Sequence, residues 1–203
     1  GGRLRRLRSR SLSRSDGARL LSQGRLASSG CRGGNAHSND GALSTWDVRK
    51  ATSMYRMFYN AKDFNADLSK WDTSKVTTLS QTFSGASSFK GDLSTWSTGK
   101  VTSMSYTFHG ASNFNGDLSK WRVGEVTTLY YTFHQASQFN GDVSTWDTSK
   151  VATLHYTFNG ASQFNGDVSN WDTGKVTTMQ QTFRSASRFN HPELCGWDTS
   201  KVK

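Results

Sequence analysis

The apolar side chains follow one spacing along most of the chain. All twelve phenylalanines fall into two columns with a 25-residue period, one running from Phe58 to Phe183 and the other from Phe64 to Phe189. The seven tryptophans share the period, apart from a final step of 26, and lie at Trp46, Trp71, Trp96, Trp121, Trp146, Trp171 and Trp197. Self-similarity at such a fixed period is the mark of a repeat architecture.

One unit, read from Trp71, is WDTSKVTTLSQTFSGASSFKGDLST. A single unit has few apolar positions and cannot enclose them alone, so stacked neighbours must supply the other walls of the core. We therefore predict a repeat solenoid in which the aromatic columns form the structural core: Trp71, Trp96, Trp121, Trp146, Trp171, Phe83, Phe108, Phe133 and Phe158.

Apolar spacings of three and four also suit an amphipathic helix, but the residue types argue against one. The segment Val76–Leu79 is rich in β-branched residues, and glycines recur where a continuous helix needs good helix formers. We expect a short strand at the VTTL position, a helical or 3-10 turn at the TFxGAS position, and a second strand or extended segment at DLSTW. The Asn-Gly pairs, such as Asn115-Gly116, suit a tight corner that needs a positive φ.

The repeated segments WDTSKVTTLSQTF, GASNFNGDLSKW and GASQFNGDVSTW resemble the BspA-like leucine-rich-repeat surface proteins, whose short units have the form FNxDLSxWDTSxVTxMxxMF. The resemblance covers residues 41–203. It implies a right-handed, leucine-rich-repeat-like solenoid of six to seven turns, a cell-surface or extracellular location, and attachment to a host or matrix partner. It implies no catalytic residue and no cofactor. A column that often holds cysteine in that family is alanine here, for example at Ala86 and Ala111.

The net charge of +10 is unevenly distributed. Residues 1–40 hold nine arginines and two aspartates, so the remainder of the chain is close to neutral. We expect residues 1–40 to be a basic arm and 41–203 to be the solenoid. The arm's composition fits a disordered linker, an organellar targeting segment, or a contact with an anionic membrane surface. It contains no aromatic residue to stack on bases, which argues against nucleic acid as a partner.

Catalysis needs a unique set of residues, whereas most polar residues here recur in every unit. No hydrolase, phosphate-loop or zinc-protease motif is present, so we predict no enzyme activity, small-molecule substrate or cofactor. Two aspartate columns, which include Asp117 and Asp147, could hold calcium, but turn aspartates more often accept backbone N–H bonds. Paired threonines, such as Thr77 and Thr78, invite an ice-binding interpretation, although neighbours on a strand point to opposite faces.

The two positions after each Leu or Met of VTTL vary most between units, and five of the six tyrosines lie there. Tyrosine is favoured at recognition surfaces because it offers a large amphipathic area for little entropy. The alternative is that these tyrosines only shield the edge of the core. The predicted partner-binding residues are Tyr106, Tyr130, Tyr131, His155 and Tyr156, with His109 and His134 nearby.

Two functions remain open from the sequence. The chain is expected to be a non-catalytic recognition or adhesion module that binds a protein or extracellular-matrix partner. The alternative is a structural spacer or scaffold without a specific ligand. A binding module requires its variable columns to cluster on one exposed face.

Overall fold

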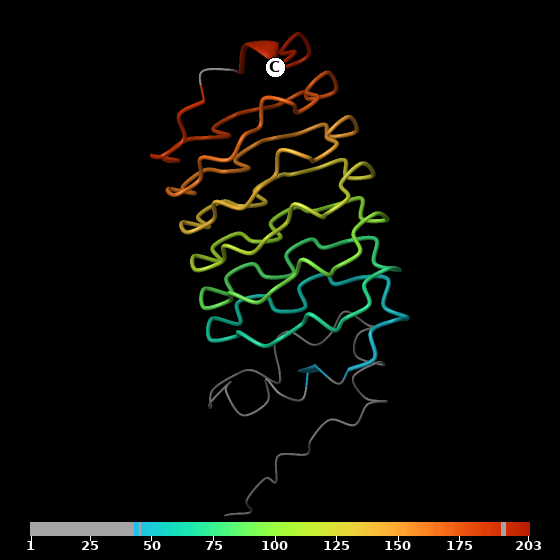
Figure 1. Cartoon of the computed structure of the whole chain (residues 1–203). Helices are drawn as coiled ribbons and strands as arrows, with labels where there is room; N and C mark the ends of the chain where they lie inside the picture. The colour runs from blue at the N-terminus through green and yellow to red at the C-terminus, as the bar shows by residue number, and fades with distance from the viewer. Residues whose placement is uncertain (1–42, 45, 192–193) are drawn as a thin grey trace, which may run out of the picture.

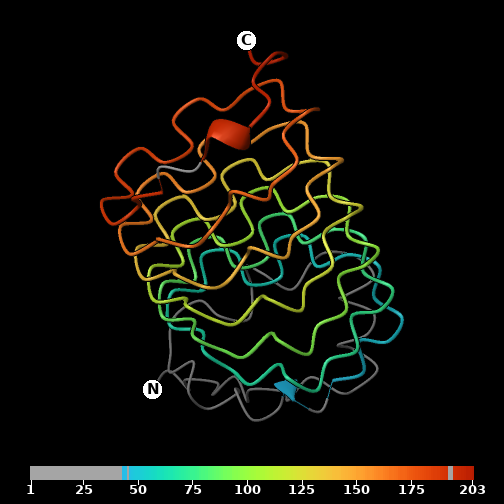
Figure 2. The ribbon, with the colours of Figure 1, turned by 45° about the horizontal axis from the view of Figure 1, so that its top comes forward.

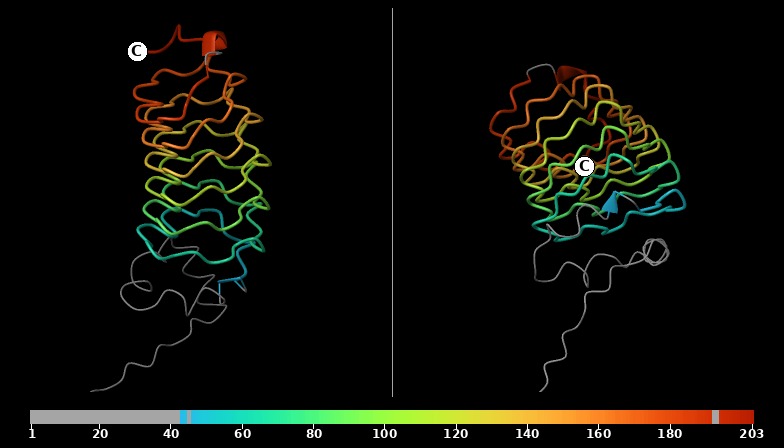
Figure 3. Two further views of the ribbon diagram at one scale, coloured as in Figure 1. Left: turned by 60° about the vertical axis from the view of Figure 1, so that its left-hand side comes forward. Right: turned by 60° about the horizontal axis from the view of Figure 1, so that its bottom comes forward.

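The computed structural model describes residues 43–44, 46–191 and 194–203. The predicted basic arm, residues 1–40, lies outside the described residues. The rest of the chain winds through successive 25-residue turns that lie one above another (Figure 1). The outline of each turn repeats that of the turn beneath it, as the tilted view and the two side views show (Figures 2 and 3).

Backbone hydrogen bonds between equivalent residues join the turns. The Phe108 N–H donates to the Thr132 carbonyl one turn ahead at 2.9 Å, and the Thr127 N–H donates to the Thr102 carbonyl one turn behind at 2.9 Å. Single-residue parallel bridges link the turns in one column: Ser53, Thr78, Ser103, Thr128, Thr153 and Thr178. The strand expected at VTTL is therefore a single bridged residue in each turn.

The backbone between the two phenylalanine columns does not form the helical turn expected at TFxGAS. The N–H groups of Thr132 and His134 do donate to carbonyls three residues back, at 3.1 and 3.2 Å. However, Tyr131 and Gln135 adopt φ of 56° and 57°. These two left-handed residues, four positions apart, interrupt the run of right-handed conformations that a helix needs. That part of the prediction is wrong.

The second strand expected at DLSTW is also absent from the described turns, where the Trp146 N–H closes a tight turn onto the Val143 carbonyl at 3.2 Å. The 3-10 helix η2 (Leu194–Gly196) lies near the C-terminal end of the stack (Figure 1). Among the described residues, no helix has the length and hydrophobicity needed to cross a membrane.

The aromatic columns fill the interior of the stack. Phe108 and Phe133 are fully buried, and their ring centroids lie 5.5 Å apart at an interplanar angle of 7°. Trp121 is 2% exposed, and its indole Nε1 donates to the Leu93 carbonyl at 3.0 Å. Each buried phenylalanine contributes roughly 1.5–3 kcal/mol through its apolar area. The indole hydrogen bond removes the cost of burying a polar donor.

Buried threonines form an additional column that the sequence analysis did not single out. The Thr132 hydroxyl is buried and lies within hydrogen-bond distance of the Met104 carbonyl, at 2.9 Å. The Thr157 hydroxyl contacts the Leu129 carbonyl at 3.0 Å in the same way. Threonine precedes five of the six phenylalanines of the column from Phe58 to Phe183. This recurrence was the available signal, since only a hydrogen-bonded hydroxyl is tolerated at such depth.

The glycines of the FNG corners are needed for a reason other than the one predicted. Gly116 and Gly141 are not among the positive-φ residues. A Cβ on Gly141 would lie 2.8 Å from the Gly116 carbonyl oxygen and 2.9 Å from the Phe139 ring. Close packing of one turn on the next therefore selects glycine there, and the expected positive φ is wrong for these corners.

Candidate functional site

The predicted partner-binding residues lie together on one side of three consecutive turns. They come from positions directly outside the phenylalanine column, where the backbone turns back on itself. Because each turn repeats the path of the last, residues 25 apart lie side by side. We use the name aromatic face for this set: Tyr106, His109, Tyr130, Tyr131, His134, His155 and Tyr156.

A ladder of three tyrosines forms the centre of the aromatic face. The ring centroids of Tyr106 and Tyr131 are 4.8 Å apart, and those of Tyr131 and Tyr156 are 4.6 Å apart at an interplanar angle of 4°. The ring faces in the ladder therefore cover one another. What remains for a partner is mainly ring edges and hydroxyl groups, which suit edge contacts and hydrogen bonds.

A second row of rings flanks the tyrosine ladder. Tyr130 stacks on His155 with centroids 5.2 Å apart at 7°, and it meets Tyr106 edge to face at 5.3 Å. His155 also lies 5.7 Å from Tyr131. The two rows thus form one contiguous surface, as the recognition hypothesis requires.

The two histidines on the other flank form a close pair. His109 and His134 stack at 4.8 Å, and their Nδ1 atoms are 2.8 Å apart. A hydrogen bond between these atoms needs a proton on one Nδ1 and a lone pair on the other. When both rings are neutral, one therefore carries its proton on Nδ1 and the other on Nε2. Burial lowers the pKa of both histidines, and with the added effect of His109 it lowers the pKa of His134 to about 4.

The same partial burial affects the phenols. Burial, assisted by the neighbouring Tyr130, raises the pKa of Tyr106 to about 12. Burial also raises the pKa of Tyr131. The phenols of Tyr106 and Tyr131 therefore stay protonated at neutral pH and can donate hydrogen bonds. All seven residues of the aromatic face are half-buried, with one side on the core and the other towards solvent.

The backbone is left-handed at the position of the tyrosine ladder in each of six turns. Tyr106, Tyr131 and Tyr156 all have φ of 56°, in the left-handed region. A bulky residue there costs roughly 1–2 kcal/mol relative to the right-handed form, whereas glycine is free of the cost. The chain does place glycine at the neighbouring left-handed corner, at Gly110 and Gly160. The equivalent Arg56, Gln81 and Gln181 adopt the same conformation, so the left-handed backbone belongs to the repeat and not to the tyrosines alone.

Other side chains occupy the same columns outside the aromatic face. In the first turn Arg56 lies 4.8 Å from the centroid of Tyr59, and its Nε donates to Gln81 at 2.6 Å. Asn159 occupies the column of the two histidines, with its side-chain nitrogen 3.5 Å from the Gln181 carbonyl. Sequence reasoning missed Tyr59 and Asn159 because, outside the two positions after VTTL, it considered only His109 and His134.

The aspartate columns are occupied by local turns. The Asp117 carboxylate accepts the Ser119 N–H at 2.9 Å, and Asp147 accepts the Ser149 N–H at 3.1 Å. Hydrogen bonds from these serines lower the pKa of both carboxyl groups. The described residues contain no group of three or more His, Cys, Asp or Glu that could hold a metal ion.

The threonine pairs are divided between two environments. Thr127 is exposed and its hydroxyl donates to the Thr102 carbonyl at 3.1 Å, whereas Thr128 is half-buried. Ala152 occupies the equivalent exposed position in the following turn. The exposed column therefore offers one threonine hydroxyl per turn, which already donates to a backbone carbonyl, and Ala152 interrupts the column.

A family model described as "Mycoplasma protein of unknown function, DUF285" matches the chain twice, over residues 31–143 and 114–203. Two overlapping matches along one chain fit a tandem-repeat protein. No curated protein and no solved structure shows a significant match.

Proposed function

Because the chain belongs to the DUF285 family, whose function is unknown, we propose its function from its own surface: the aromatic face is a non-catalytic recognition surface for a protein or extracellular-matrix partner. The observation that carries the proposal is the tyrosine ladder, in which three large rings stack on one another along one half-buried face.

The chemistry of the face supports a protein-like partner. Its phenol and imidazole groups offer hydrogen bonds on a rigid apolar base, a combination typical of binding hot spots. Neither Asp nor Glu occurs between Thr128 and Phe139 or between Thr153 and Phe164, the segments that form its central and C-terminal parts. A partner with acceptor groups and apolar side chains therefore meets no like-charge repulsion from these segments.

The architecture of the module is part of the proposal. We assign the stack of turns to the leucine-rich-repeat-like solenoids and, within them, to the BspA-like surface proteins that its repeats resemble. This assignment carries with it a location at the cell surface and a role in adhesion. A regular stack suits that role because its long side offers a rigid, extended surface.

The test replaces the centre of the ladder and measures attachment. The Tyr131→Ser/Tyr156→Ser double variant should bind a panel of purified extracellular-matrix proteins more than about tenfold more weakly than the parent chain, because hot-spot aromatics carry most of the affinity of an interface. Surface plasmon resonance with the immobilised chain measures the loss. Circular dichroism and the melting temperature should stay close to those of the parent.

The Tyr55→Ser/Tyr59→Ser double variant is the matched control, since it removes two tyrosines from the first turn, away from the ladder. It should bind as the parent does. If the ladder variant binds as well as the control, the aromatic face is not the recognition surface. If neither variant nor parent binds any partner, the spacer function is favoured.

A further inference from the structure

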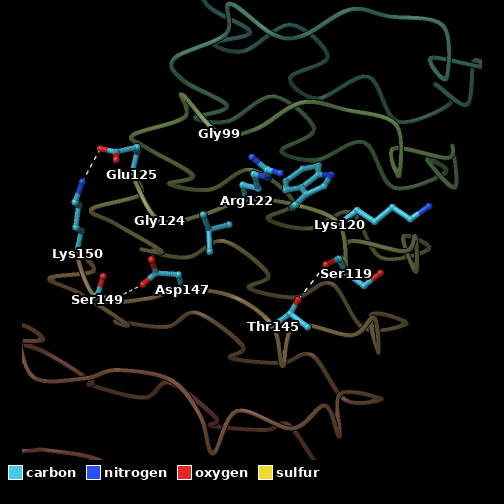
Figure 4. Close-up of a pocket in the computed structure, with 12 residues that line it drawn as sticks. Gly99, Ser119, Lys120, Arg122, Gly124, Glu125, Thr145, Asp147, Ser149 and Lys150 are labelled. Atoms are coloured by element: carbon cyan, nitrogen blue, oxygen red, sulfur yellow. Dashed lines mark hydrogen bonds and ion pairs between the residues drawn. The ribbon is translucent and has the colours of Figure 1, made fainter.

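One turn departs from the repeat in the segment between His109 and Tyr130 of the aromatic face. Most turns read WDTSK or WDTGK after the tryptophan, but residues 121–125 read WRVGE. A groove of about 560 Å³ lies beside this segment and extends to Gly99 in the turn before and to Asp147 in the turn after. Figure 4 shows Gly99, Gly124 and Asp147 following one another along successive turns, with Arg122 beside them.

The position of Arg122 holds a carboxylate in most other turns. Five turns have aspartate there, and each carboxylate accepts the backbone N–H two residues ahead, as Asp172 accepts the Gly174 N–H at 2.9 Å. The two consecutive turns at the groove have Ser97 and Arg122 instead. The carboxylate column therefore has a gap of two turns, and the groove lies at that gap.

The gap leaves two backbone donors unused. Neither the Gly99 N–H nor the Gly124 N–H has a hydrogen-bond acceptor among the described residues. In the five complete corners the equivalent N–H groups bind an aspartate oxygen. Both donors thus lie where a carboxylate from outside could take the place of the missing side chain.

Arg122 supplies a positive charge at the same place. Its guanidinium makes no ion pair within the described part of the chain, although Asp147 lies in the next turn. Its Cδ passes 3.9 Å from the position of a Cβ on Gly99, so the side chain lies against the preceding corner. The other charge change in this segment, Glu125, is neutralised by Lys150 at 2.7 Å.

Asp147 does not exclude an anion from the gap. Its carboxylate is held by the Ser149 N–H at 3.1 Å, and Asp172 and Asp198 already follow it in the same column. The Asp147 Oδ2 atom lies 2.8 Å from the position of a Cβ on Gly124, whereas only Arg122 atoms lie within 4 Å of the same position on Gly99. The Gly99 N–H is therefore the donor that an incoming carboxylate reaches with less repulsion from Asp147. The Arg122 guanidinium adds a favourable charge that the complete corners lack.

We propose that the groove between residues 119–125 and 145–150 binds an acidic side chain of a polypeptide partner, whose carboxylate accepts the Gly99 or Gly124 N–H beside the Arg122 guanidinium. A peptide carboxylate is favoured because an aspartate side chain is what fills the equivalent corner in five turns. The groove also has room for several backbone atoms around that side chain. This site is separate from the aromatic face and does not depend on its function.

The test uses the full chain labelled with ¹⁵N and the peptide acetyl-Asp-Thr-Ser-amide, which has the sequence of residues 72–74. Titration should shift the amide signals of Gly99 and Gly124 with saturation. The signal of Gly174 should stay in place, because Asp172 already occupies that corner. The peptide acetyl-Asn-Thr-Ser-amide should bind about tenfold more weakly, because it offers only a neutral acceptor.

Two variants control for the role of the arginine. Arg122→Asp restores the residue of the complete corners, so it should fold normally and lose binding because its own carboxylate fills the site. Arg122→Gln removes the charge without filling the corner, and it should weaken binding about tenfold. Unchanged binding by Arg122→Asp, or equal binding of the Asn peptide, overturns the proposal. Inorganic phosphate shifting the same signals as strongly as the Asp peptide also overturns it, in favour of a small-anion site.

Discussion

At the scale of single residues, the His109–His134 pair is the group whose ionisation the fold changes most clearly. Its Nδ1 atoms are 2.8 Å apart and both rings are half-buried. A second proton on this pair would put two donors and two positive charges face to face. The fold is therefore compatible with the neutral pair and resists full protonation.

The pair makes stability depend on pH in a defined window. Burial lowers the folded-state pKa of both histidines, to about 4 for His134, whereas unfolded histidine has a pKa of about 6.5. Between these values the unfolded chain binds more protons, so stability is complete above about pH 6.5 and falls as the pH drops towards 4. Melting temperatures measured from pH 7 to pH 5 should decline in the parent chain.

A His109→Gln/His134→Gln variant should show a flatter decline over the same range. The aspartates do not obscure this comparison, because their loss of stability begins below about pH 5, near the unfolded carboxyl pKa. An equal slope in both proteins would mean that the histidine pair does not titrate as the contact implies.

At the scale of the single turn, two kinds of glycine have different physical roles. Gly110 has φ of 65°, and a Cβ there would meet nothing closer than 3.8 Å. Gly141 has an ordinary φ, but a Cβ there would lie 2.8 Å from a backbone oxygen of the neighbouring turn. The first glycine serves backbone conformation, and the second serves the spacing between turns.

We therefore expect Gly110 to tolerate a side chain and Gly141 not to tolerate one. Gly110→Asn should change the free energy of unfolding by less than about 1 kcal/mol, because asparagine accepts the left-handed region and Asn60 already does so in this column. Gly141→Ala should destabilise by about 1–3 kcal/mol through overpacking. Urea denaturation measures both. A milder effect for Gly141→Ala than for Gly110→Asn would contradict the assignment.

At the scale of the whole molecule, stability comes from contacts between adjacent turns. Trp71 bonds through Nε1 to the Leu43 carbonyl at 2.9 Å and stacks on Trp46 at 6.5 Å. Leu43 and Trp46 thus pack on the second turn. In such stacks the total stability is close to a sum over turns and their interfaces.

Deleting residues 1–40 should therefore leave the thermal transition nearly unchanged. The expected shift is less than about 3 °C, which corresponds to no more than about 1 kcal/mol for a chain of this size. Differential scanning calorimetry of the truncated and full chains makes the comparison. A larger drop would show that part of the segment covers the first turn and would place the domain boundary earlier than residue 41.

The candidate site could be predicted in part from the sequence. Variation confined to two columns, together with the enrichment in tyrosine, identified Tyr106, Tyr131 and Tyr156, and the period placed them in neighbouring turns. The left-handed backbone at these residues could not be predicted, because tyrosine carries no signal for positive φ. The Nδ1 contact between His109 and His134 depends on side-chain orientation, which the period does not determine.

For the fold, the sequence alone determined the length of the turn, the identity of the core columns and the stacking of like on like, because a strict 25-residue recurrence of Phe and Trp allows few other arrangements. The tertiary structure decided the local geometry. Hydrogen bonds to turns on both sides reduce each strand to one bridged residue, and left-handed residues replace the expected helical turn. These features arise from contacts between residues about 25 apart, whereas local propensity reflects only near neighbours in the chain.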